Sequence, residues 1–65
     1  MINYVCIDKE TKKIVYFTSA YDKLKEKYRL INLTTGEIEK SLFDSISHLL
    51  AVLEILYEIK MKSEI

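Results

Sequence analysis

Cys6 and His48 are the only cysteine and the only histidine in this chain of 65 residues, so nucleophilic or metal chemistry would depend on them. A Cys–His pair is reactive only when the two side chains are within hydrogen-bond distance and the thiol pKa is lowered. One cysteine and one histidine are too few for a structural zinc site, and a single glycine is too few for a phosphate-binding loop. We therefore interpret Cys6 as a small buried residue of a strand and His48 as a polar residue flanking a helix. We expect no enzymatic activity, no metal and no cofactor.

Charged residues offer binding chemistry instead. Glu37 and Glu39 lie two residues apart on an expected strand and so share a face. They could bind a divalent cation or a basic partner, or simply form the solvated edge of a sheet, where charge discourages aggregation.

The first half of the chain concentrates basic residues and tyrosines, which could form a cationic groove on which bases stack. The candidate contacts are Lys12, Lys13, Lys23, Lys27 and Arg29. Acidic residues are interleaved with them, and the ten basic and ten acidic residues of the chain leave no net charge. Nucleic-acid binding through this half of the chain is therefore the alternative to a protein-interaction function.

The elements that position these residues follow a weak internal repeat. Residues 7–14 and 31–38 share the pattern Ile, Asp or Asn, two variable residues, Thr, one variable residue, a charge and Ile. Asp or Asn can open a turn by bonding its own backbone, and Gly36 tolerates a positive φ. The flanking runs 2–7 and 14–18, then 28–33 and 38–43, are rich in β-branched and aromatic residues. They predict two antiparallel hairpins in one four-stranded sheet.

Each hairpin is followed by a helical pattern. Ser19 and Ser45 are candidate N-caps for a short helix over 20–27 and a long helix over 45–62. The predicted fold is a single α+β domain, residues 1–65, with the order ββαββα. It has repeat units 2–27 and 28–62, and the long C-terminal helix packs on the sheet.

The expected long helix is more apolar than its place on a sheet requires. Its apolar arc covers roughly 240° of the circumference when residues are placed about 100° apart, whereas a surface helix needs a stripe only a little over about 100° wide. The strands are also apolar on both faces. A chain this small is marginally stable without disulfides, metals or oligomerisation, and only the last is open to it. We therefore predict a homodimer held by Val52, Ile55, Leu56 and Ile59.

No apolar run approaches the roughly 18 residues of a membrane span, no signal peptide is visible, and one cysteine fits a reducing compartment. The sequence thus predicts a cytoplasmic, non-enzymatic protein-interaction module that is homodimeric. Such a module would bind a further protein as a regulator, inhibitor or accessory factor, a kind of protein that mobile elements also carry. The partner's identity is not encoded in any motif.

Overall fold

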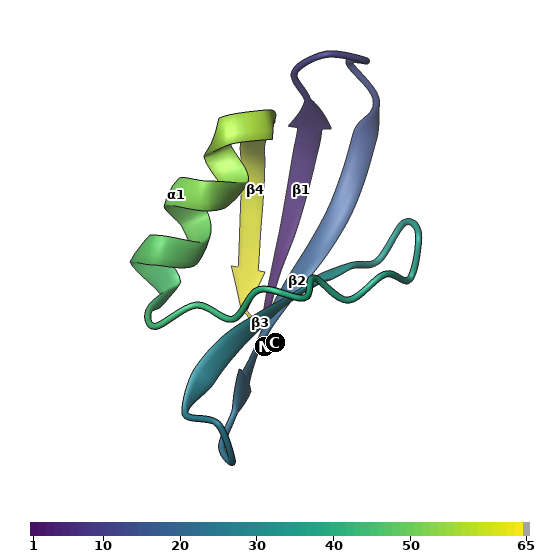
Figure 1. Cartoon of the computed structure of the whole chain (residues 1–65). Helices are drawn as coiled ribbons and strands as arrows, with labels where there is room; N and C mark the ends of the chain where they lie inside the picture. The colour runs from purple at the N-terminus through teal and green to yellow at the C-terminus, as the bar shows by residue number, and fades with distance from the viewer. Residues whose placement is uncertain (65) are drawn as a thin grey trace.

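The computed structural model describes residues 1–64 and contains one sheet and one helix (Figure 1). The elements are β1 (Ile2–Asp8), β2 (Ile14–Asp22), β3 (Lys27–Asn32), α1 (Ile46–Leu56) and β4 (Tyr57–Glu64). The strands are ordered β3-β2-β1-β4, and every neighbouring pair is antiparallel. Because β3 and β4 occupy opposite edges, the chain between them has to cross the sheet. Residues 33–45 and α1 make this crossing on one face, and the other face stays open.

Cross-strand pairing decides which side chains face α1. Tyr4 lies opposite Phe17, and Leu30 lies opposite Ser19, so these side chains share the covered face. The buried hydrophobic core consists of Tyr4, Cys6, Phe17, Leu30, Phe43, Leu49 and Leu53. The core therefore lies between the covered face of β1, β2 and β3, the buried side of α1, and one residue of the crossing segment.

A buried hydrogen bond crosses the first hairpin. The Tyr4 hydroxyl and Ser19 Oγ are 3.0 Å apart, and both residues are almost fully buried. On the open face, buried Thr18 donates its hydroxyl to the carbonyl of Ile2 at 3.1 Å. Within residues 1–64, no buried side-chain nitrogen or oxygen is left without a partner, as the cost of an unpaired buried polar group requires.

The predicted order ββαββα is wrong because the long C-terminal helix does not exist. α1 ends at Leu56, and Tyr57 already has extended backbone angles and begins β4. From Tyr57 onward, apolar and charged residues alternate with a period of two, which is a strand pattern. Pairing with the free edge of β1 then supplies the hydrogen bonds that a continued helix would have made internally. Ser45 does cap α1, since its Oγ accepts from the His48 backbone N–H at 3.1 Å.

The short helix over 20–27 is also absent. β2 continues to Asp22 and a turn follows, so Ser19 is a buried strand residue and not an N-cap. Ser19 and Ala20 pair with Leu30 and Arg29 of β3, and these ladder bonds replace the helical ones. The repeat units 2–27 and 28–62 therefore do not share a hairpin-and-helix structure.

The first predicted hairpin is present as β1 and β2, but the second is only partly formed. The run 38–43 follows β3 through two isolated bridges, Ile31 to Ile38 and Tyr28 to Phe43. Four residues of β3 (28–31) thus span the same length as six residues of the crossing segment (38–43), so this segment bulges and is no regular strand. The fourth strand of the sheet is β4 instead.

Three turns of the molecule share one design, and two of them are the turns of the sequence repeat. Asp8, Asp22 and Asn32 each open a turn, and each Oδ1 accepts from the backbone N–H groups two and three residues later at 2.8–3.2 Å. Four residues after each of them the backbone has a positive φ. The residue there is Lys12 in the first turn (64°), Glu26 in the second (54°) and Gly36 in the third (79°).

Candidate functional site

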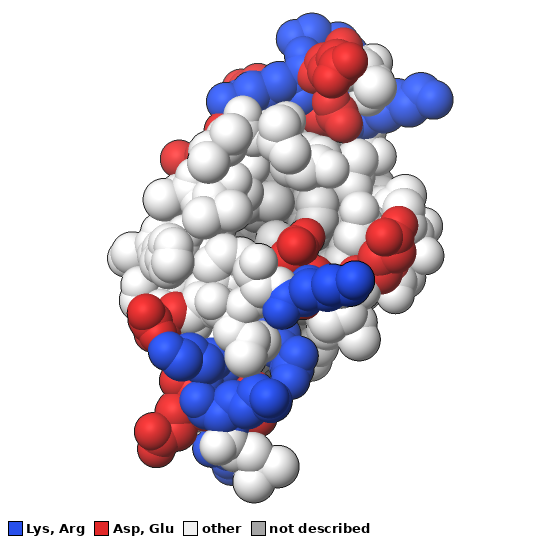
Figure 2. All heavy atoms as spheres, viewed as in Figure 1, with Lys and Arg blue, Asp and Glu red and all other residues white. Residues whose placement is uncertain are grey.

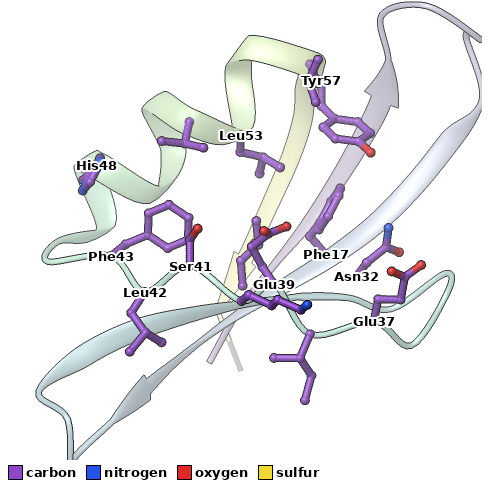
Figure 3. Close-up of a pocket in the computed structure, with 15 residues that line it drawn as sticks. Phe17, Asn32, Glu37, Glu39, Ser41, Leu42, Phe43, His48, Leu53 and Tyr57 are labelled. Atoms are coloured by element: carbon purple, nitrogen blue, oxygen red, sulfur yellow. The ribbon is translucent and has the colours of Figure 1, made fainter.

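The most prominent concave feature is a groove of about 860 Å³ between α1 and the crossing segment. Figure 2 shows it as a hollow in a broad area of uncharged atoms. In Figure 3, Phe17, Phe43, Leu53 and Tyr57 point toward one another across it, with α1 on one side and residues 37–43 on the other. Leu30 completes the floor.

Polar groups gather along the crossing-segment side of the groove. Glu37, Glu39 and Lys40 line it, and Asn32 stands beside Glu37 at one end (Figure 3). Neither glutamate forms an ion pair within residues 1–64. Burial, and then nearby carboxylates that include Glu39, raise the pKa of the Tyr57 hydroxyl above its usual value. The groove is thus apolar inside and carries two free carboxylates on its rim.

The exposed side of α1 extends this apolar surface. Val52 and Leu56 line the groove, while Ile55 lies on the outside of the helix, and these side chains are 39%, 65% and 69% exposed. Ile59, the fourth predicted interface residue, lies opposite Cys6 on the covered face of the sheet and packs against the core. It therefore belongs to a different surface. We call the groove together with Val52, Ile55 and Leu56 the helix-and-groove surface.

The open face of the sheet is a second apolar area. Val5 and Ile31 are half-buried there, whereas Ile14 and Tyr16 are about half exposed. Its buried member is Thr18. None of these residues lines the groove beside α1. This face matches the expectation that the strands are apolar on both sides.

The basic residues proposed to contact nucleic acid do not form one surface. Lys12 and Lys13 lie in the turn before β2, while Lys23, Lys27 and Arg29 lie at its other end. Figure 2 shows the corresponding separate groups of basic side chains at the two ends of the molecule. Nine residues of strand separate the groups, a length of about 30 Å.

Acidic partners also neutralise two members of that set. The Nζ of Lys27 contacts Asp44 Oδ1, and the Arg29 guanidinium bonds Asp22 Oδ2 at 2.9–3.0 Å. The remaining lysines at each end are therefore too few to form a continuous cationic track.

Cys6 and His48 are not brought together. Cys6 is fully buried on β1, and burial raises the pKa of its thiol, the opposite of what a nucleophile needs. His48 is exposed near the start of α1, where its ring meets the Phe43 ring edge-to-face at 5.4 Å. No group of three or more His, Cys, Asp or Glu residues suited to a metal ion occurs in residues 1–64.

Sequence reasoning missed the crossing-segment side of the groove. The β-rich run 38–43 predicts a regular strand of the second hairpin, whereas the structure has an irregular segment there with only two isolated bridges. The adjacent polar pair Lys40-Ser41 interrupts the alternation of that run and is the signal that could have identified an irregular segment.

No protein-family model, no curated protein and no solved structure matches this chain. Within residues 1–64, no helix is long and apolar enough to cross a membrane.

Proposed function

We propose that this protein is a non-enzymatic protein-interaction module that acts through the helix-and-groove surface, and that its first partner is a second copy of itself. The observation that carries this proposal is the exposure of Ile55 and Leu56 beside an apolar groove. Two adjacent side chains of this size, each about two-thirds exposed, are apolar area that the monomer leaves in water. Contiguous exposed apolar area of this kind is typical of protein-binding surfaces.

The amount of surface supports the same proposal. The chain exposes 4800 Å², whereas a compact monomer of 7.7 kDa is expected to expose about 4300 Å². A standard protein interface takes about 800 Å² from each partner. One such interface would cover about one-sixth of this molecule and would more than remove the excess.

The energetic contribution of α1 to such a contact can be estimated. Complete burial of an isoleucine or leucine side chain contributes about 1.5–3 kcal/mol, so burying the exposed two-thirds of Ile55 or Leu56 contributes about 1–2 kcal/mol. A two-fold symmetric dimer contains each contact twice. These four side chains would together contribute several kcal/mol toward the entropic cost of association, and the groove would add to this.

The test is the molar mass in solution across a dilution series, by sedimentation or light scattering. We expect a dimer at high micromolar concentration. Ile55→Glu should raise the dimer dissociation constant by at least about 100-fold, because it places an unpaired charge in the interface. The side chain of Ile55 is largely exposed, so this change should leave the fold intact.

Ile14→Glu is the matched control, since it makes the same change at a similarly exposed isoleucine on the open sheet face. It should leave the dissociation constant unchanged. A wild-type protein that stays monomeric at high micromolar concentration would refute the proposal. Loss of the dimer in the control but not in Ile55→Glu would move the interface to the open face.

A further inference from the structure

The tip of the β2–β3 hairpin carries an apolar side chain that the fold does not use. Leu24 is 97% exposed, more than any other large hydrophobic residue of the described chain. Its position is nevertheless well defined, because the backbone N–H groups of Leu24 and Lys25 both donate to Asp22 Oδ1, at 3.0 and 3.2 Å. The hairpin projects beyond the rest of the molecule at the lower end of Figure 1. Leu24 therefore contacts nothing in its own chain, its own groove included.

The residues around Leu24 are basic. Lys23 and Lys25 flank it, both are exposed, and neither forms an ion pair within residues 1–64. Glu26 follows, so the tip has a net charge of +1. The tip is thus a leucine between two ammonium groups that form no ion pair, on a turn whose backbone is hydrogen-bonded to Asp22.

The groove has the opposite properties. Its interior is lined by apolar and aromatic side chains, and its crossing-segment side carries the free carboxylates of Glu37 and Glu39. Lys40 lies on the same side, which leaves that rim with a net charge of −1. A leucine flanked by ammonium groups is complementary to an apolar groove flanked by carboxylates, both in apolar character and in charge.

We infer that the hairpin tip of one copy inserts Leu24 into the groove of a second copy, where Lys23 and Lys25 pair with Glu37 and Glu39. The inference rests on the proposed self-association and specifies its contact. Because tip and groove lie on different parts of the molecule, a two-fold axis between them lets each copy give its tip and receive its partner's. The assembly is then a closed dimer with two identical contacts.

Charge reversal on each side of the contact tests this pairing. One variant carries Lys23→Glu and Lys25→Glu, and a second carries Glu37→Lys and Glu39→Lys. Each variant alone opposes like charges at both contacts and should self-associate at least 10-fold more weakly than wild type. In an equimolar mixture both contacts of the heterodimer join opposite charges, so the mixture should recover a dimer of wild-type affinity.

Leu24→Ser tests the apolar part separately. The side chain is almost fully exposed, so the variant should unfold at the wild-type denaturant concentration when both proteins are diluted until they are monomeric, while its dimer dissociation constant rises at least 10-fold. The matched control is Lys12→Glu with Lys13→Glu, the same charge change at the opposite end of β2. It should leave the dissociation constant within about twofold of wild type, because the nine residues of β2 separate these lysines from the tip and neither lysine lines the groove.

The possible failures are distinguishable. If wild type is a monomer, the proposed self-association and this inference both fail. If wild type is a dimer that Ile55→Glu dissociates but Leu24→Ser and the charge reversals leave unchanged, only the inference fails. Failure of the mixed charge-reversal variants to pair, or growth of wild type into species larger than a dimer, would also overturn the reciprocal contact.

Discussion

Replacing Lys12 by glycine should stabilise this protein. Lys12 has a φ of 64° at the position where the equivalent turn after β3 has Gly36, with a φ of 79°. A residue with a Cβ atom in this left-handed region is disfavoured by about 1–2 kcal/mol. Glycine removes that cost but makes the unfolded chain more flexible, which costs about 0.5–1 kcal/mol. The central estimate of the net gain for Lys12→Gly is therefore about 0.5–1 kcal/mol.

The reverse change should destabilise the protein. At Gly36 an added Cβ would have no heavy atom within 4 Å, so Gly36→Ala meets no steric clash and reports the backbone cost alone. We expect a loss of about 1 kcal/mol. Glu26 has a φ of 54° in the turn after β2, and Glu26→Gly should give a gain similar to that of Lys12→Gly. The two gains should add, because nine residues of strand separate the two turns.

Urea and thermal unfolding followed by circular dichroism measure these effects. A change of 1 kcal/mol moves the midpoint temperature of a domain this small by about 4–8 °C, so Lys12→Gly should raise it by roughly 2–8 °C. All variants have to be compared at one protein concentration, since dimerisation makes the midpoint concentration-dependent. Lys13→Gly is the control, because Lys13 has a negative φ, and it should destabilise. If Lys12→Gly destabilises as much as Lys13→Gly, the argument from the shared turn is wrong.

Three more expectations concern named side chains. Ser19→Ala leaves the buried Tyr4 hydroxyl unpaired and should lower the free energy of unfolding by about 1–3 kcal/mol. A double-mutant cycle with Tyr4→Phe should show a coupling energy near 1 kcal/mol, and a coupling energy of zero would contradict the hydrogen bond. Cys6 is fully buried, and burial raises the pKa of its thiol. Ellman's reagent at pH 8 should therefore label the native protein far more slowly than the urea-unfolded protein, and equal labelling rates would contradict the burial of Cys6. Backbone N–H donors of the turn and then the Arg29 guanidinium lower the pKa of Asp22 below 3.8. Because the pKa of Asp22 is lower in the folded protein than in the unfolded chain, its stabilisation is present above about pH 3.8 and is lost as the pH falls through the folded pKa. The urea midpoint should therefore decline less between pH 7 and pH 2 in Asp22→Asn than in wild type.

Local chemistry explains which parts of the fold could be predicted. The β1–β2 hairpin follows from two β-rich runs joined by a turn that Asp8 opens, and the turn after β3 follows from Asn32 and Gly36 in the same way. In each case the side chain that specifies the structure bonds a backbone group two or three residues away. Such interactions are visible in the sequence because both partners lie within one short window.

The predictions were wrong where contacts between residues distant in the sequence determine the structure. Residues 20–27 contain good helix formers, but Ser19 and Ala20 complete a ladder with β3, and tertiary pairing overrides a weak local preference. The groove could not be predicted for a related reason. Its two sides come from α1 and residues 37–43, and their separation depends on how the crossing segment bulges along β3. The residue pattern of neither segment alone predicts that separation.

Only part of the apolar surface predicted for residues 45–62 is exposed in the structure and open to a partner. The broad apolar arc assumes a helical period throughout residues 45–62, whereas the period changes from 3.6 to 2 at Tyr57. Tyr57 and Ile59 therefore widened the arc although both pack against the core of the monomer. Val52, Ile55 and Leu56 widened it too, and they stay exposed on α1. The case for a second chain thus depends on these three side chains and the groove beside them, and Ile55→Glu addresses that surface without disturbing the core.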